Sequence, residues 1–180
     1  MTIGRFLINQ MIAGGIINAV LNGPPVLLVL TETTKWHLWK GFPSIALDTC
    51  GMAFGVSWGT GWILTTALRK QVAQGKITLP RGLPDKIKAD FGKWPHSAFH
   101  RGINLSGLAV FLGALPTIAL LAALGVSEWG PSTIVTYKTL FGLVMGAIFT
   151  PLTAIGVMVE EERRVQTAPA AALDVERVEG

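Results

Sequence analysis

Long apolar runs alternate with short polar segments along the whole chain, and a longer polar segment at 69–101 divides the runs into two pairs. A helix needs about 20 mostly apolar residues to cross a bilayer, and four runs reach this length. The pattern therefore predicts an all-α fold, with a bundle of four transmembrane helices in two hairpins at 1–165. We expect the spans at about 6–30, 45–68, 103–124 and 133–159, followed by a flexible tail at 166–180.

The composition agrees with a membrane protein. Of the 180 residues, 14% are charged, whereas a soluble domain has about 25%. The first apolar run is longer than the core of a signal peptide, which has about 7–15 residues, and no clear small-x-small site follows it, so we expect a span there. The single cysteine, Cys50, excludes an internal disulfide and a CxxC redox or zinc motif.

The segment at 69–101 carries most of the positive charge, and only Asp85 and Asp90 oppose it. Basic segments are retained on the cytoplasmic side of a membrane, so we expect this segment and both termini to be cytoplasmic in a cell (inner) membrane. Because the basic residues flank apolar spans and no reading motif accompanies them, nucleic acid is not an expected partner. These basic residues are Arg69, Lys70, Lys76, Arg81, Lys86, Lys88, Lys93 and Arg101.

Apolar residues recur at helical spacing inside this basic segment, between Pro84 and Pro95. The spacing predicts a short helix in the membrane interface, with its apolar stripe in the acyl boundary and its lysines towards the lipid phosphates. A docking site for an acidic partner is the alternative. The stripe is Leu83, Ile87, Phe91 and Trp94, and the residues expected to contact lipid headgroups are Lys86, Lys88, Lys93 and Trp94.

The first span contains a polar stripe, because Gln10, Gly14, Asn18 and Asn22 follow one another at steps of four residues. Amide groups in hydrocarbon need hydrogen-bond partners, so this stripe is expected to face other helices or a wet cavity. The sequence Gly23-Pro24-Pro25 follows directly and predicts a break in the helix, since proline removes backbone donors.

Glycines repeat every fourth residue in the second and fourth spans, a pattern typical of tight helix contacts. The order Phe-Gly, Gly and Thr-Ala also occurs in both spans at the same spacing. Such an echo favours a parallel repeat of two hairpins, but chance matches are common in glycine-rich apolar sequence, so both alternatives stay open. The expected packing glycines are Gly51, Gly55, Gly59, Gly142 and Gly146.

Two ionisable residues, Asp48 and Lys138, lie inside the predicted spans. Both are roughly 8–10 Å below the outer boundary at 1.5 Å per residue, so they can pair between the second and fourth helices. One interpretation is a salt bridge that fixes the helix register. The other is a protonation or ion site at the mouth of a cavity, because charged groups inside membranes are costly. That cavity would be lined by Asn18, Asn22, Ser57 and Thr60.

Patterns of known catalytic chemistry are missing from the sequence. No histidine lies in a span, and there is no Gly-x-Ser-x-Gly, phosphate loop or closely paired carboxylates in the apolar region. His96 and His100 are four residues apart, but no third ligand lies close by in sequence, so no metal site is predicted. We expect no cofactor and no enzymatic activity.

Two functions remain after these exclusions. The polar stripe, the proline breaks and the two intramembrane charges favour a permease-like or channel-like protein that moves a small solute or ion, as a homo-oligomer. The alternative is a non-catalytic accessory or assembly subunit that packs against a larger membrane complex through its glycine and asparagine faces. Apart from the lipid bilayer, the expected partners are therefore further copies of the chain or other membrane subunits.

Overall fold

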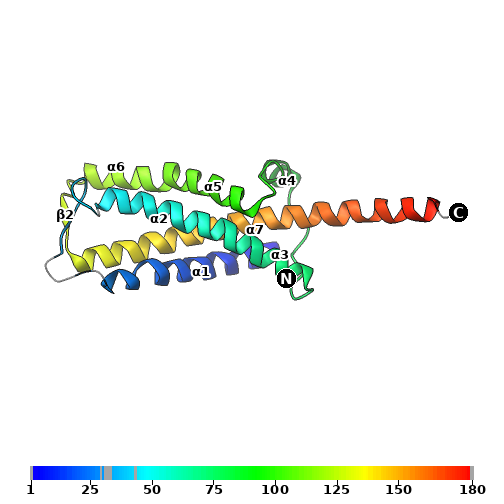
Figure 1. Cartoon of the computed structure of the whole chain (residues 1–180), viewed down its shortest axis with the longest axis horizontal. Coiled ribbons are helices and arrows are strands. Elements are labelled where there is room, and N and C mark those ends of the chain that lie inside the picture. Colours follow the sequence, from blue (N-terminus) through cyan, green and yellow to red (C-terminus); the bar gives the residue numbers. More distant parts are fainter. Residues whose placement is uncertain (1, 29, 31–33, 43, 179–180) are drawn as a thin grey trace.

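A computed structural model describes residues 2–28, 30, 34–42 and 44–178, with side chains up to residue 166. The protein is mostly helical, and its helices lie side by side in an elongated bundle (Figure 1). The α-helices are α1 (Ile3–Asn22), α2 (Ile45–Gly59), α3 (Thr65–Ala73), α4 (Asp85–Phe91), α5 (Ala98–Ala109), α6 (Leu115–Ala123) and α7 (Pro131–Val178). Two π-helical turns, η2 (Thr60–Leu64) and η3 (Val110–Ala114), join α2 to α3 and α5 to α6. The strands are β1 (Trp36–His37) and β2 (Glu128–Trp129).

Three helical segments are long and apolar enough to cross a membrane: Ile3–Leu28, Ala98–Ala123 and Pro131–Gln166. The continuous rod from α2 to α3 lies beside them (Figure 1) but does not meet the same requirement, because Asp48 and many Gly, Ser, Thr and Trp residues interrupt its apolar positions. The architecture is therefore compatible with an all-α membrane protein in which three of the four expected spans are apolar enough.

The proline-rich positions differ in their local outcome. At Gly23-Pro24-Pro25 the predicted break is present, since α1 ends at Asn22 and the chain continues as the 3-10 helix η1 (Pro24–Leu28). At Pro116 the helix continues, and it contains the π-helical turn η3 just before the proline, at the position where a proline leaves the carbonyl of Leu112 without its N–H partner.

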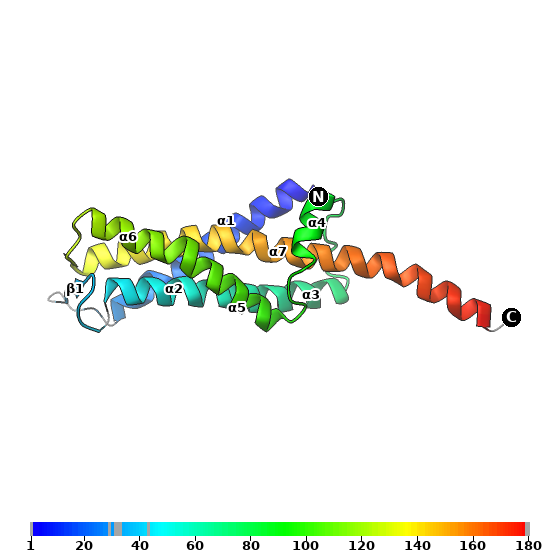
Figure 2. The same ribbon diagram turned by 90° about the horizontal axis from the view of Figure 1, so that it is seen from above.

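The most extensive packing joins helices that are distant in sequence. The α1 helix lies along α7, and α2 lies along α5 (Figures 1 and 2). The two predicted hairpins are therefore present in the connectivity, whereas the tightest contacts form between the first and last helices and between the second and third. A parallel repeat stays a prediction.

One end of the bundle, called the loop end below, is closed by pairing of the two connecting segments. β1 and β2 are antiparallel, with Trp36 opposite Trp129 and His37 opposite Glu128. Lys35 Nζ also lies 2.6 Å from Glu128 Oε1. This short ladder was not expected from the sequence. A small apolar cluster, which includes Trp36, Leu38 and Ile134, lies beneath it.

The opposite end, called the basic end below, carries α4. The predicted helix is present, but the placement of its apolar stripe in the acyl boundary is wrong: Leu83, Ile87 and Phe91 pack into a core cluster with residues of α1, α3 and α7. Trp94 stacks on Phe91, with ring centres 4.6 Å apart. The reason is that apolar side chains of the bundle at this end, such as Phe6, Leu68 and Val157, are covered by the stripe.

The lysines of α4 differ from one another. Lys88 Nζ lies 2.9 Å from Glu162 Oε2 and is thus bound to α7, whereas Lys86 and Lys93 are exposed. Contact of Lys86, Lys93 and Trp94 with lipid headgroups stays a prediction. Beyond the apolar part of α7, the backbone continues as a helix to Val178. The side chains of 167–180 lie outside the described residues, so mobility of the tail at 166–180 also stays a prediction.

Candidate functional site

A cleft of about 520 Å³ separates α1 from the rod formed by α2, η2 and α3. Its floor is buried and includes Asn18, Val56 and Thr150, the last of which belongs to α7. Its rims are exposed: Ile17 is 56% and Ile63 is 67% accessible. The cleft therefore opens at the side of the bundle. Its lining residues are Gln10, Ala13, Gly14, Ile17, Asn18, Leu21, Asn22, Gly55, Val56, Gly59, Thr60, Ile63, Leu64, Ala67 and Thr150.

The wall formed by α1 carries two asparagines whose amide nitrogens each donate one hydrogen bond within α1. Asn18 Nδ2 donates to the carbonyl of Gly14 at 2.9 Å, and Asn22 Nδ2 donates to the carbonyl of Asn18 at 2.8 Å. These bonds follow from the spacing of four residues, which places each amide over the preceding turn. The Oδ1 atoms are left as acceptors, so this wall offers acceptor oxygens in a mostly apolar cleft whose other polar side chains are Gln10, Thr60 and Thr150.

The opposite wall contains glycines that meet no other helix. A Cβ atom at Gly55 or Gly59 would have nothing within 4 Å. On the other side of the same rod, a Cβ at Gly61 would lie 2.7 Å from Gly102 Cα, so the π-helical turn holds the rod tightly against α5. The rod thus packs through Gly61 and leaves Gly55 and Gly59 as open space. π-helical turns are frequent at functional sites, and η2 contributes Thr60, Ile63 and Leu64 to the cleft.

The structure brings together only part of the predicted cavity. Asn18, Asn22 and Thr60 line the cleft, whereas Ser57 does not. The Ser57 side chain is fully buried, and its Oγ has no hydrogen-bond partner among the described residues. Asp48 and Lys138 also lie outside the cleft lining, so the expected ion site at its mouth is not the arrangement found.

The ion pair between Asp48 and Lys138 is present. Lys138 Nζ lies 2.6 Å from Asp48 Oδ1 and 2.8 Å from Oδ2, and 5.5 Å from the centre of the Trp36 ring. Next to it, the hydroxyls of Thr49 and Tyr137 are 2.7 Å apart. The ammonium group of Lys138 is therefore paired with the carboxylate of Asp48 and also lies over the Trp36 ring. The ion pair joins α2 to α7 near the loop end.

The packing glycines divide into two groups. Gly142 and Gly146 lie against α1: a Cβ at Gly142 would be 2.7 Å from the carbonyl oxygen of Asn18, and one at Gly146 would overlap the carbonyl of Gly14. Gly51, like Gly55 and Gly59, has nothing within 4 Å of a Cβ. Among the described residues, nothing packs against a Cβ at these three glycines, and self-association through them stays a prediction.

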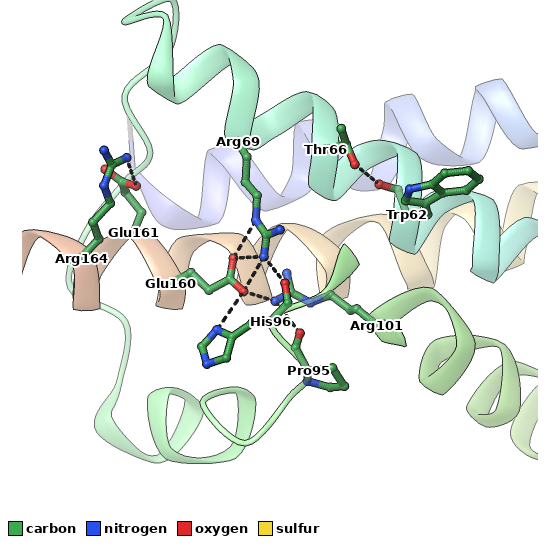
Figure 3. Close-up of polar contacts among 9 residues, drawn as sticks. All are labelled: Trp62, Thr66, Arg69, Pro95, His96, Arg101, Glu160, Glu161 and Arg164. Atoms are coloured by element: carbon green, nitrogen blue, oxygen red, sulfur yellow. Dashed lines mark hydrogen bonds and ion pairs between the residues drawn. The ribbon is translucent and has the colours of Figure 1, made fainter. Parts of the chain in front are cut away.

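A charge network closes the basic end and was missed by sequence reasoning. Glu160 of α7 accepts hydrogen bonds from Arg69 at 2.8 Å and from Arg101 (Figure 3). Arg101, which is 1% exposed, also donates to the carbonyl of Pro95 at 3.2 Å, and Arg69 donates to that of His96 at 2.5 Å. Glu160 therefore joins α7 to Arg69 of α3 and Arg101 of α5. The signal in the sequence was that Arg101 precedes one apolar run and Glu160 follows another, which places both at the basic end of the bundle.

Glu162 forms a second contact of this kind. Burial by itself raises the pKa of Glu162, but the hydrogen bond from Lys88 and those from the backbone N–H groups of Leu83 and Gly82 outweigh it, so the pKa lies below its usual value. The same contact raises the pKa of Lys88. Glu162 therefore fixes α4 and the preceding loop to α7.

Among the residues that the structure describes, no group of three or more His, Cys, Asp or Glu side chains lies close enough to hold a metal ion. His96 Nδ1 lies 3.8 Å from Glu160 Oε1, as part of the network at the basic end. No family model, curated protein or solved structure matches the chain. The cleft must therefore be interpreted from its own residues.

Proposed function

We propose that the chain is a small permease-like membrane protein, in which the cleft between α1 and the α2–α3 rod receives an uncharged solute. The single observation that carries this proposal is a cleft whose α1 wall presents the Oδ1 atoms of Asn18 and Asn22 from within an apolar helix. Its α1 lining runs from Gln10 to Asn22, centred within the apolar segment Ile3–Leu28. Binding sites of transporters lie near the bilayer midplane in the same way, at interruptions of helical structure.

The size and lining of the cleft agree with a binding site. Ligand pockets are commonly about 300–1,000 Å³, mostly apolar, with a few polar groups that orient the ligand. The cleft has about 520 Å³, and its polar groups are few and lie on facing walls.

The charged groups favour an uncharged solute. The cleft lining contains no charged residue, and Asp48, the candidate ion site, is neutralised by Lys138 at 2.6 Å. An ion in an apolar cleft without a counter-charge would be strongly disfavoured. We therefore assign the Asp48–Lys138 pair to holding α2 against α7.

The proposal includes four membrane crossings. The rod at 45–73 lies beside the three apolar helices (Figure 1). Of its polar side chains, Thr49 and Ser57 are fully buried and Asp48 is 18% exposed. The positive-inside rule then favours a cytoplasmic basic end and cytoplasmic termini in a cell membrane, since Arg69 and Arg101 lie there.

The experiment is a flux assay in proteoliposomes with three proteins: wild type, Gly59→Leu and Gly51→Leu. Osmotic swelling is measured with neutral solutes of graded size, and translocation is measured with fluorescent chain-bearing analogues. A leucine at position 59 fills the cleft without a clash, whereas position 51 is equally open but lies outside the lining. We expect flux of at least one solute in the wild type and Gly51→Leu but not in Gly59→Leu. Flux in none of the three, or equal flux in all, contradicts the proposal.

An accessory or assembly subunit is the second candidate, because Gly51, Gly55 and Gly59 form an open small-residue face that another helix or a second copy can cover. A helix that packs on this face would contact all three glycines, whereas the cleft is lined only by Gly55 and Gly59. Purification in mild detergent distinguishes them: loss of a fixed partner or of a homo-oligomer in Gly51→Leu favours the subunit function. Retention of the wild-type state in Gly51→Leu favours the cleft.

A further inference from the structure

The cleft contains information about the chemistry of its ligand. The lining has no Asp, Glu, Lys or Arg, and the nearest charged contacts described above, Asp48 with Lys138 and Arg69 with Glu160, are each paired. An uncompensated charge would therefore gain no counter-ion here. The ligand must be uncharged.

The hydrogen-bonding groups restrict the ligand further. One N–H of each asparagine amide is used by a carbonyl of α1, at 2.9 Å for Asn18 and 2.8 Å for Asn22, so each side chain keeps its Oδ1 as an acceptor and one further N–H. A buried acceptor is satisfied by a hydroxyl or N–H group. A hydroxyl group fits best, because it can donate to an Oδ1 and accept from the remaining N–H in the half of the cleft that lies towards the loop end.

The shape of the cleft restricts the rest of the molecule. Its lining on α1 extends from Gln10 to Asn22 and on the opposite rod from Gly55 to Ala67, which is about 18 Å of helix on each side. The half towards the basic end is lined by Ile63, Leu64 and Ala67, with Gln10 as its polar side chain on α1, and the rims of the cleft are exposed. A long apolar cleft that opens sideways is reached from the bilayer rather than from water.

We infer that the ligand of this cleft is an uncharged, chain-like amphiphile that enters from the bilayer, with a hydroxyl or N–H head bound to Asn18 and Asn22 and its chain along Gly55, Gly59 and Ile63. This inference names the solute class for the proposed permease. Transport of the ligand rests on the proposed function, whereas binding of the ligand does not. Binding can be tested without flux. A ligand that binds but is not moved would leave the inference standing and overturn the permease.

The test uses the full chain in phosphatidylcholine nanodiscs and a photoactivatable probe, 1-hexadecanol with a diazirine in its chain. Labelled residues are identified by mass spectrometry in the wild type, Gly59→Leu, Gly51→Leu and Asn22→Ala. Asn22→Ala removes the acceptor but keeps the Cβ that lies against Gly142. The lipid-facing residues Phe111 and Leu112, each 69% exposed, report non-specific labelling in every sample.

We expect labelling of the cleft walls in the wild type and in Gly51→Leu. Filling the cleft in Gly59→Leu is expected to lower it at least about tenfold, and Asn22→Ala about fivefold, as loss of one hydrogen bond implies. Unlabelled 1-hexadecanol is expected to compete about fivefold better than hexadecane, which lacks the donor, and much better than hexadecyltrimethylammonium.

Equal labelling in Gly59→Leu, equal competition by the cationic amphiphile, or labelling of the cleft no stronger than at Phe111 would overturn the inference. A homo-oligomer that excludes the probe in the wild type, and becomes a monomer in Gly59→Leu, would also overturn it, because a second copy would then occupy the cleft. In the first three cases flux of a different neutral solute in proteoliposomes would still support the permease, whereas a second copy in the cleft would overturn the permease as well.

Discussion

The two faces of α1 show opposite uses of small residues. On one face, Gly14 meets Thr150 and Gly146 of α7 so closely that added Cβ atoms would overlap them. On the other, α1 faces Gly55 and Gly59 across a cleft of about 520 Å³. Glycine at every fourth residue allows close approach but does not enforce it. The closed face fixes the bundle, and the open face leaves room for a ligand.

Gly146→Leu is the substitution with the largest expected effect, because it forces the closed face apart. Its Cβ overlaps the Gly14 carbonyl and lies 2.7 Å from Asn18 Nδ2, so α1 must move away from α7. Overpacking costs typically 1–3 kcal/mol, and backbone overlap places this case at about 3 kcal/mol. Unfolding by SDS titration in detergent micelles measures it. The matched control is Gly59→Leu, expected within about 0.5 kcal/mol of wild type; equal losses in both variants would contradict the comparison.

Lys138→Met is expected to have the next largest effect, because it leaves the carboxylate of Asp48 unpaired beside α7. Breaking a buried pair costs about 3–5 kcal/mol, and since Asp48 is 18% exposed we expect about 2 kcal/mol. Loss of the ion pair would also loosen the α2–α3 rod, which forms one wall of the cleft, so flux or probe labelling is expected to change as well. The double variant Asp48→Asn with Lys138→Met is expected to recover most of the stability. No recovery would contradict a structural role for the pair.

The contact of α4 with α7 gives a pH dependence. Because the pKa of Glu162 is lowered in the folded protein, its contribution to stability is fully present above the usual Glu pKa of about 4.3 and is lost as the pH falls below that value. The raised pKa of Lys88 means that its share is present below 10.5 and is lost as the pH rises further.

Thermal unfolding of wild type and Glu162→Gln between pH 3 and 7 measures the Glu162 contribution. The difference between the two proteins is expected to be largest near neutral pH and to shrink below about pH 4.3. A difference that does not depend on pH would contradict the assignment. Neither α4 nor the loop before it contributes to the cleft lining, so binding in the cleft is expected to be unaffected by Glu162→Gln.

Gly51→Leu is expected to have the smallest effect. Its side chain projects into open space and lies outside the cleft lining, so stability within about 0.5 kcal/mol, flux and probe labelling should all match the wild type. Size-exclusion chromatography with light scattering provides the decisive readout. A change of oligomeric state would show that the open face is an interface between copies.

Local chemistry explains what the sequence predicted well. The end of α1 at Asn22 follows from Gly23-Pro24-Pro25, and α4 follows from apolar residues at helical spacing after Pro84. The Asp48–Lys138 pair could be predicted because an isolated charge at that depth is costly and both residues lie at similar depth.

What could not be predicted depends on contacts between distant segments. Gly55 and Gly146 have similar neighbours in sequence, yet one is open and the other closed, because only Gly146 is in contact with α1. The hydrogen bond of Arg101 to Glu160 joins residues 59 positions apart, and a charge at the edge of a span looks the same in sequence whether it is solvated or buried. Ser57 shares the polarity of Thr60 but points into the core.

The central claim, that Gly59 borders open space while Gly146 lies in a closed contact, can be tested by spin labelling in nanodiscs. A nitroxide is attached at Gly59→Cys or at Gly51→Cys in a Cys50→Ser background, and its mobility and oxygen accessibility are measured with and without 1-hexadecanol. We predict a mobile, oxygen-accessible label at position 59 that becomes immobilised by 1-hexadecanol, and a label at position 51 that does not respond. A label at position 59 that is immobile and shielded from oxygen without ligand would contradict the account.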